Sequence, residues 1–229
     1  MNIIGRIKTD FPEKFGLPRQ SGLIKELKGE IIFEKEYAVN EAVRGLSDYS
    51  HIWILWEFSE AKRECFSPTV RPPRLGGETR MGVFATRSPF RPNPIGLSVV
   101  KLDSIEYRKN VGPVLLVSGI DLMDGTPIYD IKPYLPHIDS IPDATGGFST
   151  EVKDYALNVV FENEEDKKLC GEHVETVKKI LSNDPRPSYQ NDENRVYGMC
   201  FLGMNIRFLV RKNEVYVIKI EKIKNRLIF

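Results

Sequence analysis

The sequence predicts a mainly β fold, a barrel or a sandwich, followed by a small α+β appendage. The first two thirds of the 229-residue chain consist of short β-branched or aromatic runs separated by Gly, Pro and Asp, which is typical of strands joined by turns. Little helix interrupts these runs, and this favours a barrel or a sandwich. A stretch rich in Ser, Gly, Pro and Asp at 140–155 precedes a change of pattern, so we expect a domain boundary there.

The strands of the first domain are expected where the apolar runs lie. The run HIWILWEF is apolar on both faces, which predicts a strand in the interior of a sheet or barrel rather than at an edge. A helical turn is expected at Glu41–Leu46. The expected strands are Ile3–Thr9, Gly29–Phe33, His51–Phe58, Met81–Thr86, Gly96–Ile105 and Val114–Ile120.

The appendage is expected to contain one helix and a terminal hairpin. Asn163 is a plausible N-cap, and acidic residues follow it in the first turn. Apolar residues recur at helical spacing up to Leu181, although Gly171 lowers the helix propensity. Near the end of the chain, alternating apolar and polar residues flank the turn RKNE, which predicts a hairpin with a preceding strand.

Composition excludes several classes of protein. The net charge of +1 gives no global polyanion-binding signal, so a nucleic-acid surface must come from local clustering. Three widely separated cysteines predict neither a disulfide framework nor a zinc site, and the histidines have no metal-like spacing; no metal is expected. No stretch approaches the length of a membrane span, and we expect a cytoplasmic protein. Dinucleotide-binding and Walker motifs are absent from the sequence.

The segment from Arg71 to Pro94 concentrates fixed positive charge on a stiff backbone. It contains five arginines and five prolines, with Glu78 as its one acid and no lysine. Guanidinium groups match phosphate and carboxylate, and prolines lower the entropy lost when a ligand orders the loop. The arginines could instead pair with the chain's own carboxylates, but their number favours an anion-binding surface. The RNA-binding candidates are Arg71, Arg74, Arg80 and Arg91, and Arg186 in the appendage.

Two further loops carry polar groups suited to a small ligand. The turn Asp124–Gly125–Thr126 offers a carboxylate and free backbone groups beside a strand end, although a simple chain reversal explains it equally well. The loop with Pro18, Arg19 and Gln20 would, taken alone, be a surface turn.

Taken together and in order, five segments resemble the TsaA-like or TrmO family of S-adenosylmethionine-dependent tRNA N6-methyltransferases. These segments are EKFGLPRQSGL, AVRGLSDYSHIWILWEF, RPPRLGGETRMGVFATRSPFRPNPIGLSVVKL, DGTPIYDIKPYLP and DPRPSY. The resemblance implies a mixed β-barrel at 1–142 that binds the cofactor, and a C-terminal α+β domain at 150–229 that contributes to tRNA binding. It also implies a homodimer.

The implied reaction transfers a methyl group to the N6 nitrogen of threonylcarbamoyladenosine at position 37, next to the anticodon of a threonine tRNA. A carboxylate or tyrosine near this nitrogen could remove its proton, and Asp124 and Tyr189 are the candidates, with Arg186 next to an RNA phosphate. DPRPSY could equally be a helix stop followed by a rigid turn. The implied S-adenosylmethionine pocket comprises Pro18, Arg19, Gln20, Ser59, Glu60, Arg87, Leu97, Asp124, Gly125, Thr126 and Pro127.

In that pocket, Arg19 or Arg87 could hold the cofactor carboxylate, Asp124 its amino group or ribose hydroxyls, and Leu97 could cover the adenine. A non-catalytic regulatory protein that binds RNA or S-adenosylmethionine is the alternative function. A methyltransferase of the same fold that acts on a small molecule or another RNA position is a third.

Overall fold

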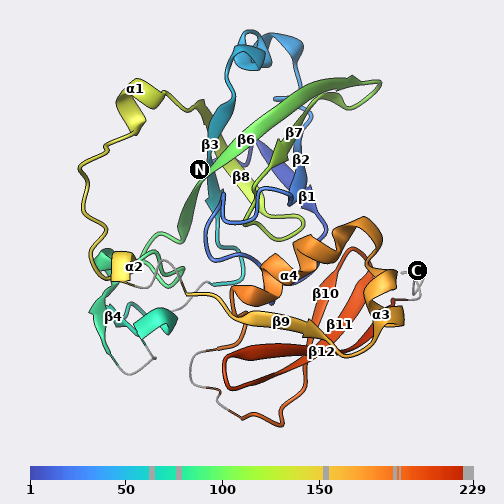
Figure 1. Cartoon of the computed structure of the whole chain (residues 1–229). Helices are drawn as coiled ribbons and strands as arrows, with labels where there is room; N and C mark the ends of the chain where they lie inside the picture. The colour runs from blue at the N-terminus through green and yellow to red at the C-terminus, as the bar shows by residue number, and fades with distance from the viewer. Residues whose placement is uncertain (62–64, 76–78, 152–154, 188–189, 191, 224–229) are drawn as a thin grey trace.

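The computed structural model describes residues 1–61, 65–75, 79–151, 155–187, 190 and 192–223. The N-terminal part forms a closed β-barrel, and the C-terminal part forms a separate sheet with two helices beside it (Figure 1). The predicted fold class, mainly β with an α+β appendage, is confirmed. In the described part of the chain, no helix is both long enough and apolar enough to span a membrane.

Six strands close the barrel in the order β1-β2-β7-β6-β3-β8, with β8 returning to β1. Every pairing around it is antiparallel, whereas the expectation was a mixed barrel. The strands are β1 (Gly5–Thr9), β2 (Lys28–Phe33), β3 (His51–Glu57), β6 (Ile95–Arg108), β7 (Gly112–Ser118) and β8 (Pro127–Pro133).

Strand β3 has the interior position that its sequence predicts, because it pairs with β6 on one side and β8 on the other. Its side chains alternate: Ile52, Ile54 and Trp56 are buried inside the barrel, and the residues between them are half-buried. The outer positions are apolar too, which is why the sequence shows no alternation of apolar and polar residues.

The second sheet has the order β10-β11-β12-β9, and its one parallel pair is β12 with β9. The predicted terminal hairpin and its preceding strand are confirmed as β10 to β12. Lys212 and Asn213 both have positive φ at the turn between β11 and β12, as a tight hairpin turn requires. The bounds are β9 (Asn158–Phe161), β10 (Tyr197–Phe201), β11 (Met204–Arg211) and β12 (Glu214–Lys222).

The expected single helix of the appendage is wrong, because the structure divides it at Gly171. Asn163 caps α3 (Glu164–Leu169) by accepting a hydrogen bond from the Glu165 N–H, as predicted. Gly171 then adopts a φ of +53° within a short 3-10 turn before α4 (Val174–Ser182) begins. A left-handed residue cannot continue an α-helix, so the glycine separates two short helices.

The expected strand Met81–Thr86 is also wrong over most of its length. Only Met81–Gly82 is extended, as β5, and it pairs with the two-residue β4 (Thr69–Val70). A 3-10 turn follows, because the N–H and the hydroxyl of Thr86 both donate to the Val83 carbonyl. Three strands, β4, β8 and β9, were not expected. The turn expected at Glu41–Leu46 consists of two 3-10 turns, at Asn40–Val43 and Leu46–Asp48. Short helices α1 (Pro136–Asp139) and α2 (Phe148–Glu151) lie between the two parts.

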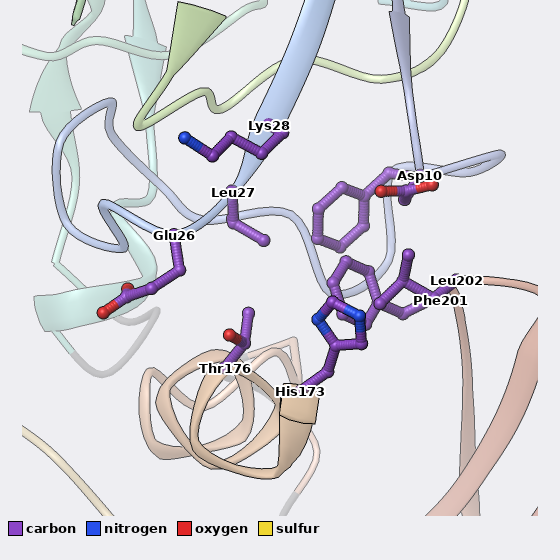
Figure 2. Close-up of a pocket in the computed structure, with 9 residues that line it drawn as sticks. Asp10, Glu26, Leu27, Lys28, His173, Thr176, Phe201 and Leu202 are labelled. Carbon is purple, nitrogen blue, oxygen red and sulfur yellow. The ribbon is translucent and has the colours of Figure 1, made fainter. Parts of the chain in front are cut away.

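The two parts pack together through aromatic residues of the loop after β1. Phe11 lies 4.9 Å from Phe201, and Phe15 lies 6.3 Å from Tyr197, between ring centroids. At the same junction, Figure 2 shows a small pocket that Asp10 and Leu27 of the barrel share with His173 and Phe201 of the C-terminal part. One apolar core therefore runs from the barrel into the second sheet. The boundaries 1–142 and 150–229 stay predictions.

Candidate functional site

Two of the predicted cofactor loops meet at one rim of the barrel. The Arg87 guanidinium donates from Nη1 to Oε1 of Gln20, and the Gln20 amide in turn donates to the carbonyl of Arg19. Arg87 is exposed, while Gln20 is partly buried. Gln20 therefore holds an exposed guanidinium, and a guanidinium has further N–H donors that suit a carboxylate or phosphate.

A buried polar chain lies behind these loops. Trp56 Nε1 donates to the Ser98 hydroxyl oxygen at 2.9 Å, and the Ser98 hydroxyl donates to Oδ1 of Asp121 at 2.7 Å. Ser98 is buried at the start of β6, and Asp121 follows the turn that ends β7. Because the serine oxygen accepts the indole hydrogen, its own hydrogen is directed at the carboxylate.

At this rim, the carboxyl group of Asp121 has a pKa well above its ordinary value. Burial raises the pKa of its carboxyl to about 6, against the lowering effect of the Ser98 hydroxyl, of the backbone N–H groups of Asp121 and Ser21, and of the Arg87 charge. A carboxylate with a raised pKa beside a cation marks a candidate functional site. Sequence reasoning missed Asp121, although an acid directly after the apolar run VLLVSGI was a usable signal.

The predicted turn at Asp124 lies beside β1, and its polar groups are largely engaged. Asp124 Oδ1 accepts from the Thr9 N–H at 2.9 Å, and the Gly125 N–H donates to the Ile7 carbonyl at 2.8 Å. Gly125 has a φ of +74°, and its carbonyl accepts from Arg6. Thr126 and Pro127 are buried, and the outer side of the turn borders an open hollow of about 290 Å³.

Arg19 is turned away from the other cofactor candidates and contacts the C-terminal part. Its Nη2 donates to the carbonyl of Asp184 at 3.1 Å and to that of Arg186 at 3.5 Å. The residues DPRP are thereby fastened to the loop that contains Gln20. This connection joins the two parts of the chain directly next to the Arg87 contact.

Arg186 forms an ion pair within the chain. Its Nε and Nη2 lie 2.8 and 2.9 Å from the carboxylate oxygens of Asp184, with side chains only 13% and 14% exposed. Burial acts to raise the pKa of Asp184, but hydrogen bonds from Arg186 and Tyr155 outweigh it and hold the pKa below its usual range. In this arrangement the Arg186 charge is already compensated, so an RNA phosphate would have to compete with Asp184.

The remaining arginine candidates differ in how they are placed. Arg71 and Arg80 are exposed, and the Arg80 guanidinium lies 3.5 Å from the Thr69 hydroxyl. Arg91 instead closes its own loop: Nη1 donates to the Thr86 carbonyl at 2.7 Å, and the guanidinium lies over Phe84. The backbone of Arg74 lies in a short 3-10 turn.

The other predicted site residues that the structure describes lie on or near the barrel. Pro18 is buried, Leu97 is 53% exposed on β6 beside Ser98, and Ser59 and Glu60 are exposed directly after β3. Tyr189 lies outside the described residues. Over the described ranges, no group of three or more His, Cys, Asp or Glu is arranged to hold a metal ion. The pocket in Figure 2, at about 50 Å³, is too small for a nucleoside.

Comparison with known proteins gives one consistent result. Residues 6–140 match the model of the tRNA-methyltransferase O N-terminal domain, and residues 154–223 match that of the TrmO C-terminal domain. The tRNA (adenine(37)-N6)-methyltransferase of Escherichia coli is 42% identical over 90% of this chain and 91% of its own. A putative S-adenosylmethionine-dependent methyltransferase of Pseudomonas aeruginosa is 38% identical over 90% of each chain. The crystal structure of TrmO from Pseudomonas aeruginosa superposes with a TM-score of 0.73 at 32% identity, over 95% of this chain and 96% of that chain.

Proposed function

Because the chain belongs to the TrmO family, we propose that it methylates the N6 nitrogen of the adenosine at position 37 of tRNA, with S-adenosylmethionine as the methyl donor. We further propose that the acceptor is threonylcarbamoyladenosine in a threonine tRNA. The observation that carries the proposal is the rim where Arg87 is held by Gln20 near the partly buried Asp121, in a chain that aligns with the Escherichia coli enzyme over 90% of its length.

The side chains at this rim fit S-adenosylmethionine, which supplies an electrophilic methyl group when it is bound. Exposed Arg87 offers guanidinium donors for the carboxylate of the amino-acid tail, and exposed Leu97 offers an apolar surface for the adenine. The Gly125 turn has open space where a side chain would begin, so a ligand could approach its backbone. Arg19 is the poorer carboxylate ligand, because its guanidinium contacts carbonyls of the C-terminal part.

The chain's contribution to methyl transfer is alignment, exclusion of water and removal of a proton. In-line displacement at a methyl carbon gains most from fixing the two reacting atoms in a near-attack geometry. The barrel supplies rigid support, because Ser98 and Leu97 lie on β6, which pairs with β3 along His51–Glu57. Loops anchored on such strands hold a ligand more precisely than free loops do.

For the tRNA we propose contacts from the arginine-rich segment. Arg71 and Arg80 are exposed there, and Phe84 is 72% exposed beside them in sequence. Exposed guanidinium groups bind the phosphate backbone, and an exposed aromatic ring offers a surface on which an unpaired base stacks. A homodimer and a cytoplasmic location remain predictions.

Arg87→Ala tests the cofactor site. Loss of charge-assisted hydrogen bonds, at about 1.5–3 kcal/mol, should weaken S-adenosylmethionine binding by about 10- to 150-fold in isothermal titration calorimetry. Arg44→Ala is the matched control, because Arg44 is exposed and its ion pair with Glu41 is a long 3.9 Å. Unchanged affinity in Arg87→Ala would remove Arg87 from the pocket.

The reaction itself is tested with tRNA from cells that lack this protein. Nucleoside mass spectrometry after incubation should reveal one methyl group added to threonylcarbamoyladenosine. Tight tRNA binding without methylation would instead favour a non-catalytic binding protein, and methylation of a different nucleoside would correct the acceptor.

A further inference from the structure

The Asp121 carboxylate marks the rim of the candidate site but has no chemical role assigned so far, and its surroundings are specific. It is partly buried, it accepts a 2.7 Å hydrogen bond from Ser98, and it also accepts from the backbone N–H of Ser21. These partners come from β6 and from the loop next to Gln20, so the carboxylate lies where the candidate cofactor loops converge.

A purely structural role does not require a charge at this position. The groups that face Asp121 are the Ser98 hydroxyl, two backbone N–H groups and the Arg87 guanidinium. The amide oxygen of an asparagine has two lone pairs and could accept from two of the three neutral donors, without the cost of a half-buried negative charge. Burial nevertheless raises the pKa of this carboxyl to about 6, which leaves it ionised at neutral pH with an unusually high affinity for a proton.

Asp124, the other carboxylate near the candidate site, is less well placed for proton transfer. One of its oxygens accepts the Thr9 N–H at 2.9 Å and so fixes the chain reversal beside β1. Asp124 is also exposed to water, which would compete for any proton it received.

We propose that Asp121 receives the proton that leaves the acceptor nitrogen during methyl transfer. The lone pair of the nitrogen forms the new N–C bond while the S–C bond breaks and leaves its electron pair on sulfur. The N–H bond then gives its proton to the Asp121 carboxylate, which returns it to water after the product leaves. Ser98 is a positioning residue, because its hydrogen, directed by Trp56, orients the carboxylate. This inference rests on the proposed function.

The first measurement needs neither cofactor nor tRNA. Carbon-13 NMR of aspartate carboxyl groups, assigned with Asp121→Asn, should show Asp121 titrating near pH 6 in the unaltered chain. In Ser98→Ala the midpoint should move to higher pH, because a hydrogen bond that favours the ionised form is lost. A midpoint near 4 in both proteins would overturn the inference.

The second measurement is the single-turnover methylation rate as a function of pH. In the unaltered chain the methylation rate should fall below about pH 6, and in Ser98→Ala this fall towards acidic pH should begin at a higher pH. Asp121→Asn should be slower by about 100-fold or more and lack this acidic limb, with S-adenosylmethionine affinity within about threefold of the unaltered chain. Asp124→Asn is the matched carboxylate control and should keep the acidic limb.

The outcomes separate the two proposals. If Asp121→Asn loses S-adenosylmethionine affinity in proportion to its loss of rate, Asp121 has a role in binding and the inference is overturned. An unchanged rate with an unchanged acidic limb in Asp121→Asn would also overturn it. Both results leave the proposed function intact, whereas a lack of methylation by the unaltered chain would remove the proposed function and this inference with it. If Asp121→Asn fails to fold, the shift of the limb in Ser98→Ala decides.

Discussion

Gly96→Ala should destabilise the barrel measurably, because the Trp56 ring occupies the space that a side chain would need. A Cβ atom built on Gly96 would lie 2.2 Å from Cε2 and 2.4 Å from Cζ2 of Trp56. The ring cannot retreat freely, since Trp56 is only 7% exposed and its centroid lies 4.2 Å from that of Phe58. Overpacking of this kind costs about 1–3 kcal/mol, and loss of the Trp56–Ser98 hydrogen bond adds about 1 kcal/mol.

A loss of about 3 kcal/mol in a chain of this size corresponds to a fall in Tm of roughly 6–12 °C. Differential scanning calorimetry measures it, with Gly82→Ala as the matched control. No heavy atom lies within 4 Å of the position that a Cβ would take at Gly82, and its φ of −55° suits alanine. If Gly96→Ala melts within about 2 °C of Gly82→Ala, the described packing of Trp56 over Gly96 is incorrect.

Three further predictions concern the charged groups near the rim. Arg19→Ala should increase proteolysis between residues 140 and 155 and weaken S-adenosylmethionine binding several-fold, because the C-terminal part would no longer hold the loop of Gln20. Asp121→Asn should be more stable than the unaltered chain at pH 7.5, by about 1–3 kcal/mol in urea unfolding, and this advantage should shrink towards pH 4. The direction of this pH effect follows from the raised pKa of Asp121. Folded, the unaltered chain binds the proton more tightly than it does unfolded, so its stability increases as pH falls from about 6 to about 4. Arg186→Ala should destabilise by about 2–3 kcal/mol, seen as a lower urea midpoint, and adding Asp184→Asn should recover part of the loss.

Much of the fold was predictable because local pattern and tertiary role agree. The apolar run of β3 has partners on both sides, and the turn at Lys212–Asn213 joins two strands of alternating pattern. The strand β8 was hidden because prolines stand at both of its ends, positions where a missing N–H is tolerated but which suggest a loop in the sequence. The strand β9 has only four residues, too few to establish a period.

The candidate site was predictable in its loops but not in its contacts. The excess of arginine predicted an anion-binding segment, and the family resemblance assigned its Arg87 to the cofactor; the structure brings Arg87 to Gln20 of another predicted loop. Nothing local could indicate that Arg19 contacts the Asp184 carbonyl, because 165 residues separate the two groups in the chain. The raised pKa of Asp121 was equally hidden, since it depends on burial that only the closed barrel creates.

The loop before β2 places three consecutive residues against three different partners. Arg19 contacts carbonyls of the C-terminal part, Gln20 accepts from Arg87, and Ser21 accepts from the Val99 N–H through its hydroxyl while donating its own N–H to Asp121. These three residues are covalently joined in one short segment, so a large movement of one of them is transmitted in part to its neighbours. A displacement of the C-terminal part would therefore shift both the guanidinium proposed to hold the cofactor and the carboxylate proposed to accept the proton. The contacts of Arg19, Gln20 and Ser21 thus connect the C-terminal part to the barrel rim through one short segment.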